Sequence, residues 1–176
     1  AVAIIPATLL AQDVCRIENL PNISDVACMF KILTQMGAQV KIINKHTVEI
    51  NTKTVNSYII PHEMTKQLRA SYYLIGALLG RYSRAKVALP GGCNFGVRPI
   101  DLHIRGFELL GANVTVENAM INARADHLTG SAIYMDKVSV GATINIMLAA
   151  VKARGLTIIE HAAKEPHIVD LANFLN

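Results

Sequence analysis

The chain has 176 residues, of which 52% are hydrophobic and 17% charged, with 11 Gly, 6 Pro and no Trp. A disordered or collagen-like chain needs far fewer apolar residues or far more Pro and Gly, so this composition predicts one globular domain with a substantial core. The net charge of +4 comes from 17 basic and 13 acidic residues that are spread along the chain, which favours a mildly basic surface or a small-anion site over a nucleic-acid interface.

The first elements along the chain are a helix, a strand, a second helix and a hairpin. Residues 1–10 form an apolar helical pattern with no Met in front of it, which indicates a piece of a longer chain. The second helix starts at Asp25 and ends at Gly37, where a left-handed backbone conformation stops it. The predicted strands are 14–17, 41–44, 47–51 and 55–60, of which the second and third form a hairpin.

A third helix is predicted over residues 62–81. Its sequence is so apolar that little polar face remains, so we expect it to be buried on more than one side. The order of elements then recurs at offsets of about 70 to 76 residues, with Asp25, Asp101 and Asp170 at equivalent positions as helix-starting residues. The repeat predicts three units that close around a pseudo-threefold axis, with the helices inside and the sheets outside. Their approximate bounds are 1–60, 61–135 and 136–176, the third being incomplete.

Several classes of partner are excluded by the same pattern. The longest apolar runs, 74–79 and 146–151, are far shorter than the roughly 18 residues needed to span a bilayer. Three Cys without a CxxC pair fit neither a disulfide framework nor a zinc site and suit a reducing compartment, and the six His share no metal-ligand spacing. We therefore expect a soluble, cytoplasmic protein without metal, nucleic-acid or membrane partners.

The connector over residues 89–99 is the strongest candidate for chemistry. It is longer than the equivalent connectors 18–24 and 161–167, and it alone contains three Gly, Cys93 and Arg98. Glycines permit close approach of the backbone to a ligand, and a neighbouring cation lowers the pKa of an exposed thiol. Cys93 is therefore the predicted reactive thiol. The other two, at positions 15 and 28, fall on apolar periodic positions and are expected to be buried packing residues.

Residues 90–103, PGGCNFGVRPIDLH, resemble the active-site loop of the UDP-N-acetylglucosamine 1-carboxyvinyltransferase family, the enolpyruvyl transferases that commit the sugar nucleotide to bacterial peptidoglycan. Residues 135–143 and 157–170 match the same family. The resemblance implies a two-domain enzyme without metal or organic cofactor, whose substrate cleft lies between the domains. Each domain is then an inside-out α/β barrel of the EPSP synthase type, with a threefold βαβαββ repeat, central helices and outer sheets.

The reaction implied by this resemblance moves the enolpyruvyl group of phosphoenolpyruvate to the 3-hydroxyl of UDP-N-acetylglucosamine, by addition followed by elimination of phosphate. Cys93 matches the general acid that protonates the methylene carbon and forms an adduct with phosphoenolpyruvate, and it matches the thiol that fosfomycin alkylates. Arg98 matches the Arg that holds the phosphoenolpyruvate anion. The residues implied to bind the substrates are Arg69, Arg98, Pro99, Ile100, Asp101, Leu102, Lys137, Val138, Ser139 and Val140.

The charge and position of residues 137–140 also favour phosphate binding, because Lys137 is a cation and the free N–H groups at a helix start favour phosphate. His103 directly follows the loop, and two interpretations stay open for it: it orients Arg98 or ligand, or it is a satisfied surface histidine. Tyr73 stands where relatives often have Trp.

Two parts of the family pattern are absent from this sequence. One is a Lys-Asn pair that precedes the first helix and binds phosphoenolpyruvate. The other is the partner domain, which supplies the carboxylate proposed to deprotonate the sugar hydroxyl. We therefore predict that the chain alone has no transferase activity. The alternative is a non-catalytic module that binds the UDP-sugar through Arg69, Arg98 and Lys137, and a nucleic-acid-binding repeat domain ranks last.

Overall fold

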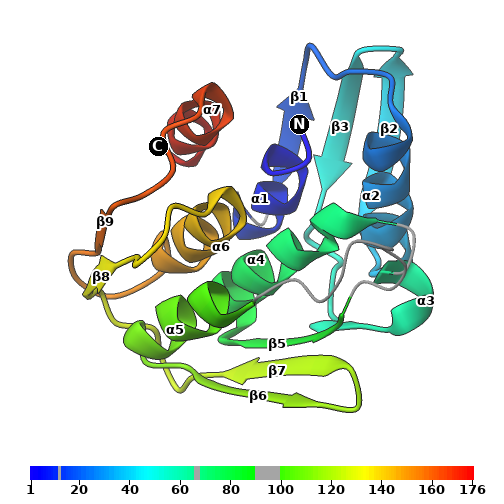
Figure 1. Cartoon of the computed structure of the whole chain (residues 1–176). Helices are drawn as coiled ribbons and strands as arrows, with labels where there is room; N and C mark the ends of the chain where they lie inside the picture. The colour runs from blue at the N-terminus through cyan, green and yellow to red at the C-terminus, as the bar shows by residue number, and fades with distance from the viewer. Residues whose placement is uncertain (12, 66–67, 90–99) are drawn as a thin grey trace.

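The computed structural model describes residues 1–11, 13–65, 68–89 and 100–176, with the backbone alone for Arg69. Three small sheets lie on the outside of the described chain, and helices fill the space between them (Figure 1). The first sheet is antiparallel in the order β1-β3-β2 and consists of β1 (Val14–Ile17), β2 (Gln39–Asn44) and β3 (Thr47–Asn51).

The other two sheets each begin with a parallel pair of strands. In the second sheet, of order β4-β5-β7-β6, the pairs after the first are antiparallel; its strands are β4 (Ile59–Ile60), β5 (Arg84–Ala88), β6 (Asn113–Glu117) and β7 (Met120–Arg124). The third sheet pairs β8 (Ala132–Tyr134) with β9 (Ile158–Glu160). The bounds of the three repeat units, 1–60, 61–135 and 136–176, stay a prediction.

Three helices form the interior: α1 (Ile4–Ala11), α4 (Tyr73–Tyr82) and α6 (Val140–Ala150). α4 packs against both of the others. Every residue from 74 to 79 is buried, so the expectation that this helix is covered on more than one side is confirmed. A helix can be covered all round only if it is apolar all round, and this explains why these three segments have so few charged residues.

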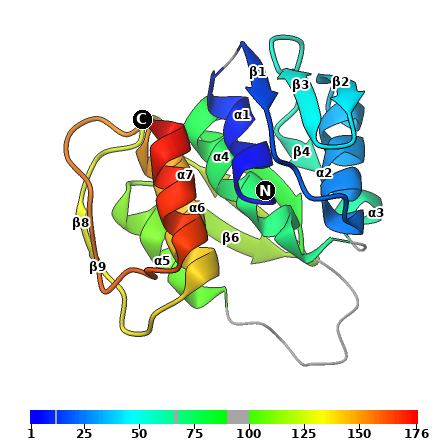
Figure 2. The same cartoon turned by 90° about the horizontal axis from the view of Figure 1, so that it is seen from above.

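The longer outer helices are α2 (Ser24–Gln35), α5 (Asp101–Leu109) and α7 (Pro166–Leu175). Each buries one face and exposes the other, as the charged and polar residues on them require. α7 packs on α6 and α1, and the view from above shows it beside these two helices, on the far side of α1 from the first sheet (Figure 2).

Glycines in α4 allow its close contact with α6. A Cβ atom on Gly76 would lie 2.8 Å from Oδ1 of Asn145 and would collide with that residue's carbonyl oxygen. A Cβ atom on Gly80, one turn later, would lie 2.8 Å from the carbonyl oxygen of Leu148. The two helix backbones therefore approach more closely than any other residue type would permit.

The first third of the chain follows its local sequence signals. The strand at 14–17 and the hairpin of 41–44 with 47–51 are confirmed, with Ile42 opposite Val48 in the register. Gly37 has φ +100° directly after the end of α2, so the predicted left-handed stop is confirmed as well.

The strand predicted over 55–60 is wrong except for its last two residues, Ile59–Ile60. The start of that segment makes other bonds instead of ladder bonds. The amide of Val55 donates to the carbonyl of Thr52, and its own carbonyl accepts from the hydroxyl of Tyr82 at 2.6 Å.

The single helix predicted over 62–81 is also wrong. It is divided into α3 (His62–Thr65), the 3-10 turn η1 (Arg69–Tyr72) and α4. Leu68 has an extended backbone with φ −132° and ψ 112°, which no α-helix can contain. Its side chain is 1% exposed, so the break turns an apolar side chain into the core.

The interpretation of the three aspartates as helix-starting residues holds for two of them. Asp25 and Asp101 lie in the first turns of α2 and α5, where a carboxylate interacts favourably with the helix dipole. Asp170 lies in the middle of α7, which begins at Pro166. For this residue the prediction is wrong, because a proline at the start of a helix needs no acidic residue to set the boundary.

Candidate functional site

The segment 137–140 leads directly into α6. Lys137 and Val138 are exposed, and Val140 is the first helical residue. Ser139 is the N-cap: its hydroxyl oxygen accepts from the amide of Ala142 at 3.3 Å, and its carbonyl accepts from the hydroxyl of Thr143 at 2.8 Å. The cap satisfies one of the first amides and leaves the preceding N–H groups of the helix without an intrahelical acceptor. The predicted helix start is thus present, and anion binding there stays a prediction.

The segment 100–102 leads into α5 in the same manner. Asp101 is exposed at the first position of the helix, whereas Ile100 and Leu102 are half-buried against the core. Arg105, one turn further along, forms an ion pair with Asp136. Both side chains are more than half exposed, so the pair contributes little stability, but it shows that the start of α5 lies beside the residues that precede α6.

His103 holds the same two helix starts together from the inside. Its side chain is 9% exposed, and a Cβ atom added to Gly141 would lie 3.3 Å from both Cε1 and Nε2 of the ring. Its Nδ1 is 2.9 Å from Nδ2 of Asn145. The interpretation of His103 as a surface histidine is wrong, because α6 covers the ring.

The partners of Asn145 determine the protonation of this histidine. Oδ1 of Asn145 accepts from the amide of Gly76 at 2.9 Å, so Nδ2 of the same amide group faces the imidazole. Nδ1 of His103 must therefore be the acceptor, and the single ring proton lies on Nε2. Burial lowers the pKa of His103 to about 4, so the ring is neutral at physiological pH.

Arg69, another predicted site residue, belongs to the 3-10 turn before α4, and this turn contacts the His103–Asn145 pair through Tyr72. The ring of Tyr72 lies 5.8 Å from the ring of His103, centroid to centroid, at 43°. Arg69 begins the same turn, η1. The structure therefore places the starts of α5 and α6 side by side, and it places the turn that carries residue 69 near them through the ring of Tyr72.

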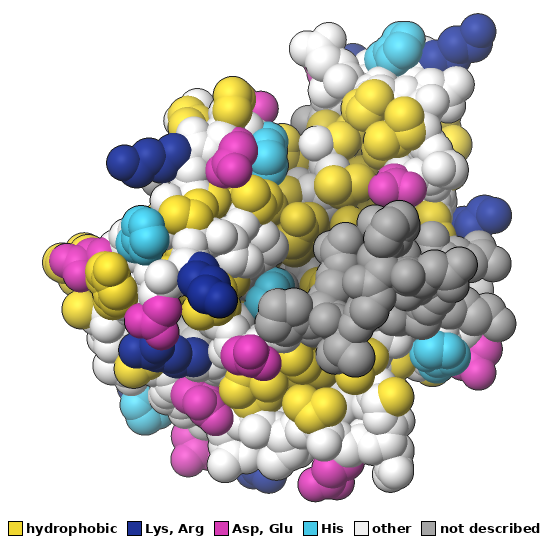
Figure 3. All heavy atoms as spheres, viewed as in Figure 1, with side chains coloured by type: hydrophobic (Ala, Val, Ile, Leu, Met, Phe, Trp, Pro, Cys, Tyr) yellow, Lys and Arg dark blue, Asp and Glu magenta, His cyan; other side chains and the backbone are white. Residues whose placement is uncertain are grey.

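A cavity of about 290 Å³ lies where the starts of several helices meet. Its walls come from residues 1–4 at the start of α1, from Tyr73 at the start of α4, from Ile144 in α6, and from His167 and Asp170 in α7. Hydrophobic side chains gather in the hollow between the α7 side and the β1–β3 side of the molecule (Figure 3). Tyr73 lines this cavity.

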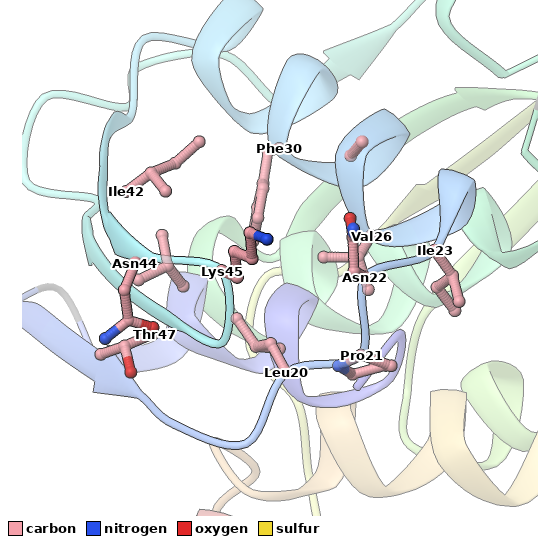
Figure 4. Close-up of a pocket in the computed structure, with 12 residues that line it drawn as sticks. Leu20, Pro21, Asn22, Ile23, Val26, Phe30, Ile42, Asn44, Lys45 and Thr47 are labelled. Carbon is pink, nitrogen blue, oxygen red and sulfur yellow. The ribbon is translucent and has the colours of Figure 1, made fainter.

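A second pocket of about 170 Å³ lies between α2 and the hairpin of β2 and β3 in the first sheet. Phe30 and Ile42 supply apolar walls, and Lys45 reaches toward it from the hairpin turn (Figure 4). Neither this pocket nor the first cavity is lined by a predicted site residue that the structure describes, and this pocket also has no described lining residue from α4, α5 or α6. It is therefore separate from the candidate site.

Cys93, Arg98 and Pro99 lie outside the described residues. The two described thiols differ from the predicted reactive one: burial raises the pKa of Cys15, with Asp13 adding to the effect, and burial likewise raises the pKa of Cys28. Both are half-buried and not fully buried as expected, because they lie on elements that each keep one face in solvent. Their raised pKa values still agree with an unreactive role.

Asn145 is not among the residues predicted from the sequence, yet it is fully buried and links its own helix α6 to α4 and α5. A signal for it was present. It is the single amide side chain within the apolar run 140–150, and a buried amide needs partners from neighbouring elements.

A model of the EPSP synthase (3-phosphoshikimate 1-carboxyvinyltransferase) family matches residues 1–176, the whole chain. The chain belongs to this family. Curated relatives are similar to the chain over its whole length. The chain is 54% identical over 176 residues to a UDP-N-acetylglucosamine 1-carboxyvinyltransferase of Caldanaerobacter subterraneus subsp. tengcongensis, and 54% identical over 177 residues to one of Clostridium botulinum. Each match covers the whole of this chain but about 42% of the relative's length.

Solved structures of the family confirm the expected fold. The enolpyruvyl transferase NikO from Streptomyces tendae matches 99% of this chain and 41% of its own, with a TM-score of 0.85 at 21% identity. An EPSP synthase from Acinetobacter baumannii matches 94% of this chain with a TM-score of 0.68 at 16% identity. The family fold is the inside-out α/β barrel, in agreement with the central helices and outer sheets found here.

Among the described residues, no helix is both long and apolar enough to cross a membrane. In the same part of the chain, no three His, Cys, Asp or Glu side chains are grouped so that they could hold a metal ion.

Proposed function

We propose that this chain forms one wall of an enolpyruvyl transferase that moves the enolpyruvyl group of phosphoenolpyruvate to the 3-hydroxyl of UDP-N-acetylglucosamine, with release of phosphate. The observation that carries the proposal is the 54% identity over the whole chain to relatives named for this activity. In this proposal the enzyme acts in the cytoplasm, at the first committed step of peptidoglycan synthesis, and needs no cofactor.

The geometry of the described residues suits a dianionic sugar nucleotide. Two helices, α5 and α6, start side by side, and unpaired amides at helix starts favour phosphate oxygens. Lys137 is an exposed cation beside them. The Ser139 hydroxyl accepts from Ala142 and so keeps its own proton free to donate to an acceptor. In this proposal the residues that bind the UDP part are Ile100, Asp101, Leu102, Lys137, Val138, Ser139 and Val140, together with Arg69 and Pro99.

Cys93 and Arg98 supply the chemistry in this proposal. The thiol of Cys93 gives its proton to the methylene carbon of phosphoenolpyruvate while the sugar oxygen bonds to the adjacent carbon and passes its own proton to a carboxylate of the second domain. Loss of phosphate together with one proton of the new methyl group then restores the double bond. Arg98 holds the phosphoenolpyruvate anion through its planar set of donors. Because the chain spans about 42% of its relatives, we expect it to bind substrate but not to turn it over without a second domain.

In the test, residues 1–176 of this chain replace the aligned segment of the full-length Clostridium botulinum relative. Phosphate release from phosphoenolpyruvate and UDP-N-acetylglucosamine is then measured for this exchanged protein. We expect turnover in the exchanged protein, none in the 176-residue chain, and loss of turnover in Cys93→Ser but not in the matched control Cys28→Ser. Fosfomycin should add one mass equivalent at Cys93.

An exchanged protein that folds and binds the sugar nucleotide without turnover would favour the non-catalytic UDP-sugar module instead. Labelling of Cys15 or Cys28 in place of Cys93 would contradict the assignment of the reactive thiol.

A further inference from the structure

A chain of buried hydrogen bonds connects three helices behind the candidate site. It runs from the amide of Gly76 in α4 to Oδ1 of Asn145 in α6, at 2.9 Å, and from Nδ2 of Asn145 to Nδ1 of His103 in α5, also at 2.9 Å. Asn145 is 0% exposed and His103 is 9% exposed. No alternative partner from solvent can replace these bonds without opening the helix contacts.

Each residue of this hydrogen-bond chain lies close in sequence to one of the three proposed substrate-binding segments, which are residue 69, residues 100–102 and residues 137–140. His103 follows Leu102 directly, Asn145 lies in the second turn of the helix that starts at Val140, and Gly76 lies in the first turn of the helix that follows η1 and residue 69. The distance from each hydrogen-bonding group to its segment is therefore at most two helical turns. A shift of one helix along another would break a bond and move a segment together.

The hydrogen-bond pattern allows one arrangement only. If the Asn145 amide turned over, its NH2 group would face the amide N–H of Gly76, which can only donate, whichever tautomer His103 adopts. This mismatch would leave a buried polar group without a partner, and such groups are strongly disfavoured. Packing of apolar side chains alone tolerates small shifts, whereas this network does not.

We propose that His103 and Asn145 are positioning residues that fix the relative placement of the three sugar-nucleotide segments; this inference rests on the proposed function. Neither side chain needs to touch the substrate. They act through Gly76, Gly141 and the helix starts that these residues define.

Two matched substitutions separate positioning from simple occupancy of the site. His103→Asn keeps an acceptor oxygen at the place of Nδ1, whereas His103→Gln moves its amide beyond the reach of Asn145. Binding of UDP-N-acetylglucosamine to the 176-residue chain is measured by calorimetry. We expect His103→Gln and Asn145→Leu to weaken the affinity by about tenfold or more, and His103→Asn to stay within about threefold of the wild type.

Ile50→Ala is the control for lost stability, because Ile50 is fully buried in the first sheet and belongs to no substrate segment. It should lower the free energy of unfolding without changing the affinity. As a direct readout, the ¹⁵N chemical shifts of the His103 ring at neutral pH should show a proton on Nε2 and an acceptor at Nδ1.

The outcomes are distinct. If the wild type binds the sugar nucleotide and His103→Gln binds it equally well, the positioning role is overturned while the proposed function stands. If Ile50→Ala weakens binding as much as His103→Gln does, the network is only a contribution to stability. If the folded wild-type chain does not bind the sugar nucleotide, the binding part of the proposed function and the positioning role are both overturned.

Discussion

Protonation of one buried histidine should make the stability of this chain depend on pH in a defined window. Burial lowers the pKa of His103 to about 4, from an ordinary value of 6.5 that applies to the unfolded chain. As the pH falls below 6.5 the unfolded state takes up a proton that the folded state does not, so the free energy of unfolding falls until both states are protonated, near pH 4. The reason is that burial of the ring disfavours its charged form. A second ring proton, on Nδ1, would also face the NH2 group of Asn145.

The size of the effect follows from these two pKa values. A difference of about 2.5 pKa units corresponds to about 3 kcal/mol when the transition is complete, of which about 1.4 kcal/mol is lost by pH 5.5 and about 2.5 kcal/mol by pH 4.5. This is a large share of the roughly 5–15 kcal/mol that stabilises a typical domain. The chain should therefore be much easier to unfold in mild acid than at neutral pH.

The assay is urea unfolding of the wild type and His103→Asn, followed by circular dichroism at pH 7.5, 6.5, 5.5 and 4.5. Other groups titrate in both proteins, so the quantity of interest is the difference between their free energies of unfolding. We expect this difference to change by about 2.5 kcal/mol in favour of the variant between pH 7.5 and 4.5. His127→Asn, at an exposed position, controls for the loss of a histidine as such. A difference between wild type and His103→Asn that stays constant with pH would refute the reasoning.

Three further predictions concern the same helix starts. Ser139→Ala removes the cap of α6 and should lower the free energy of unfolding by about 1 kcal/mol in urea titrations; a value near zero would show that the cap is not needed. Gly76→Ala forces a methyl group into the backbone of α6 and should cost about 3 kcal/mol or prevent folding, whereas Gly141→Ala, whose Cβ has 3.3 Å to the nearest ring atoms, should cost clearly less. The reverse order would contradict the packing described. A double-mutant cycle on Arg105 and Asp136 should give a coupling of at most about 1 kcal/mol that shrinks in high salt, and a salt-independent coupling would contradict the exposure of this pair.

Sequence reasoning succeeded where the signal is local. The apolar composition of the helix predicted over 62–81 indicated burial on more than one side, and residues 74–79 are all buried, because an apolar side chain is excluded from water whichever neighbours cover it. Gly37 predicted the end of a helix because a left-handed conformation is cheap for glycine alone. A helix was also predicted directly after residues 137–140, and α6 begins at Val140; the capping role of Ser139 was not predicted.

It failed where distant neighbours decide the outcome. Leu68 leaves the helical conformation although its segment favours a helix, because its side chain is turned into a core that other segments build. Val55 makes no ladder bond because Tyr82, 27 residues later, takes its carbonyl. Such competition cannot be seen in a window of local sequence.

The amino-acid sequence by itself determined which helices form the interior, where a helix stops, and which family the chain resembles, since composition, glycine and short motifs act over a few residues. Only the tertiary structure decided that His103 is buried and neutral, and that it shares a hydrogen-bond chain with Asn145 and Gly76. Asn145 is 42 residues from His103 and 69 residues from Gly76 in the sequence. The physical reason is that desolvation and hydrogen bonding depend on what surrounds a group in space, and those surroundings come from three helices that the sequence keeps far apart.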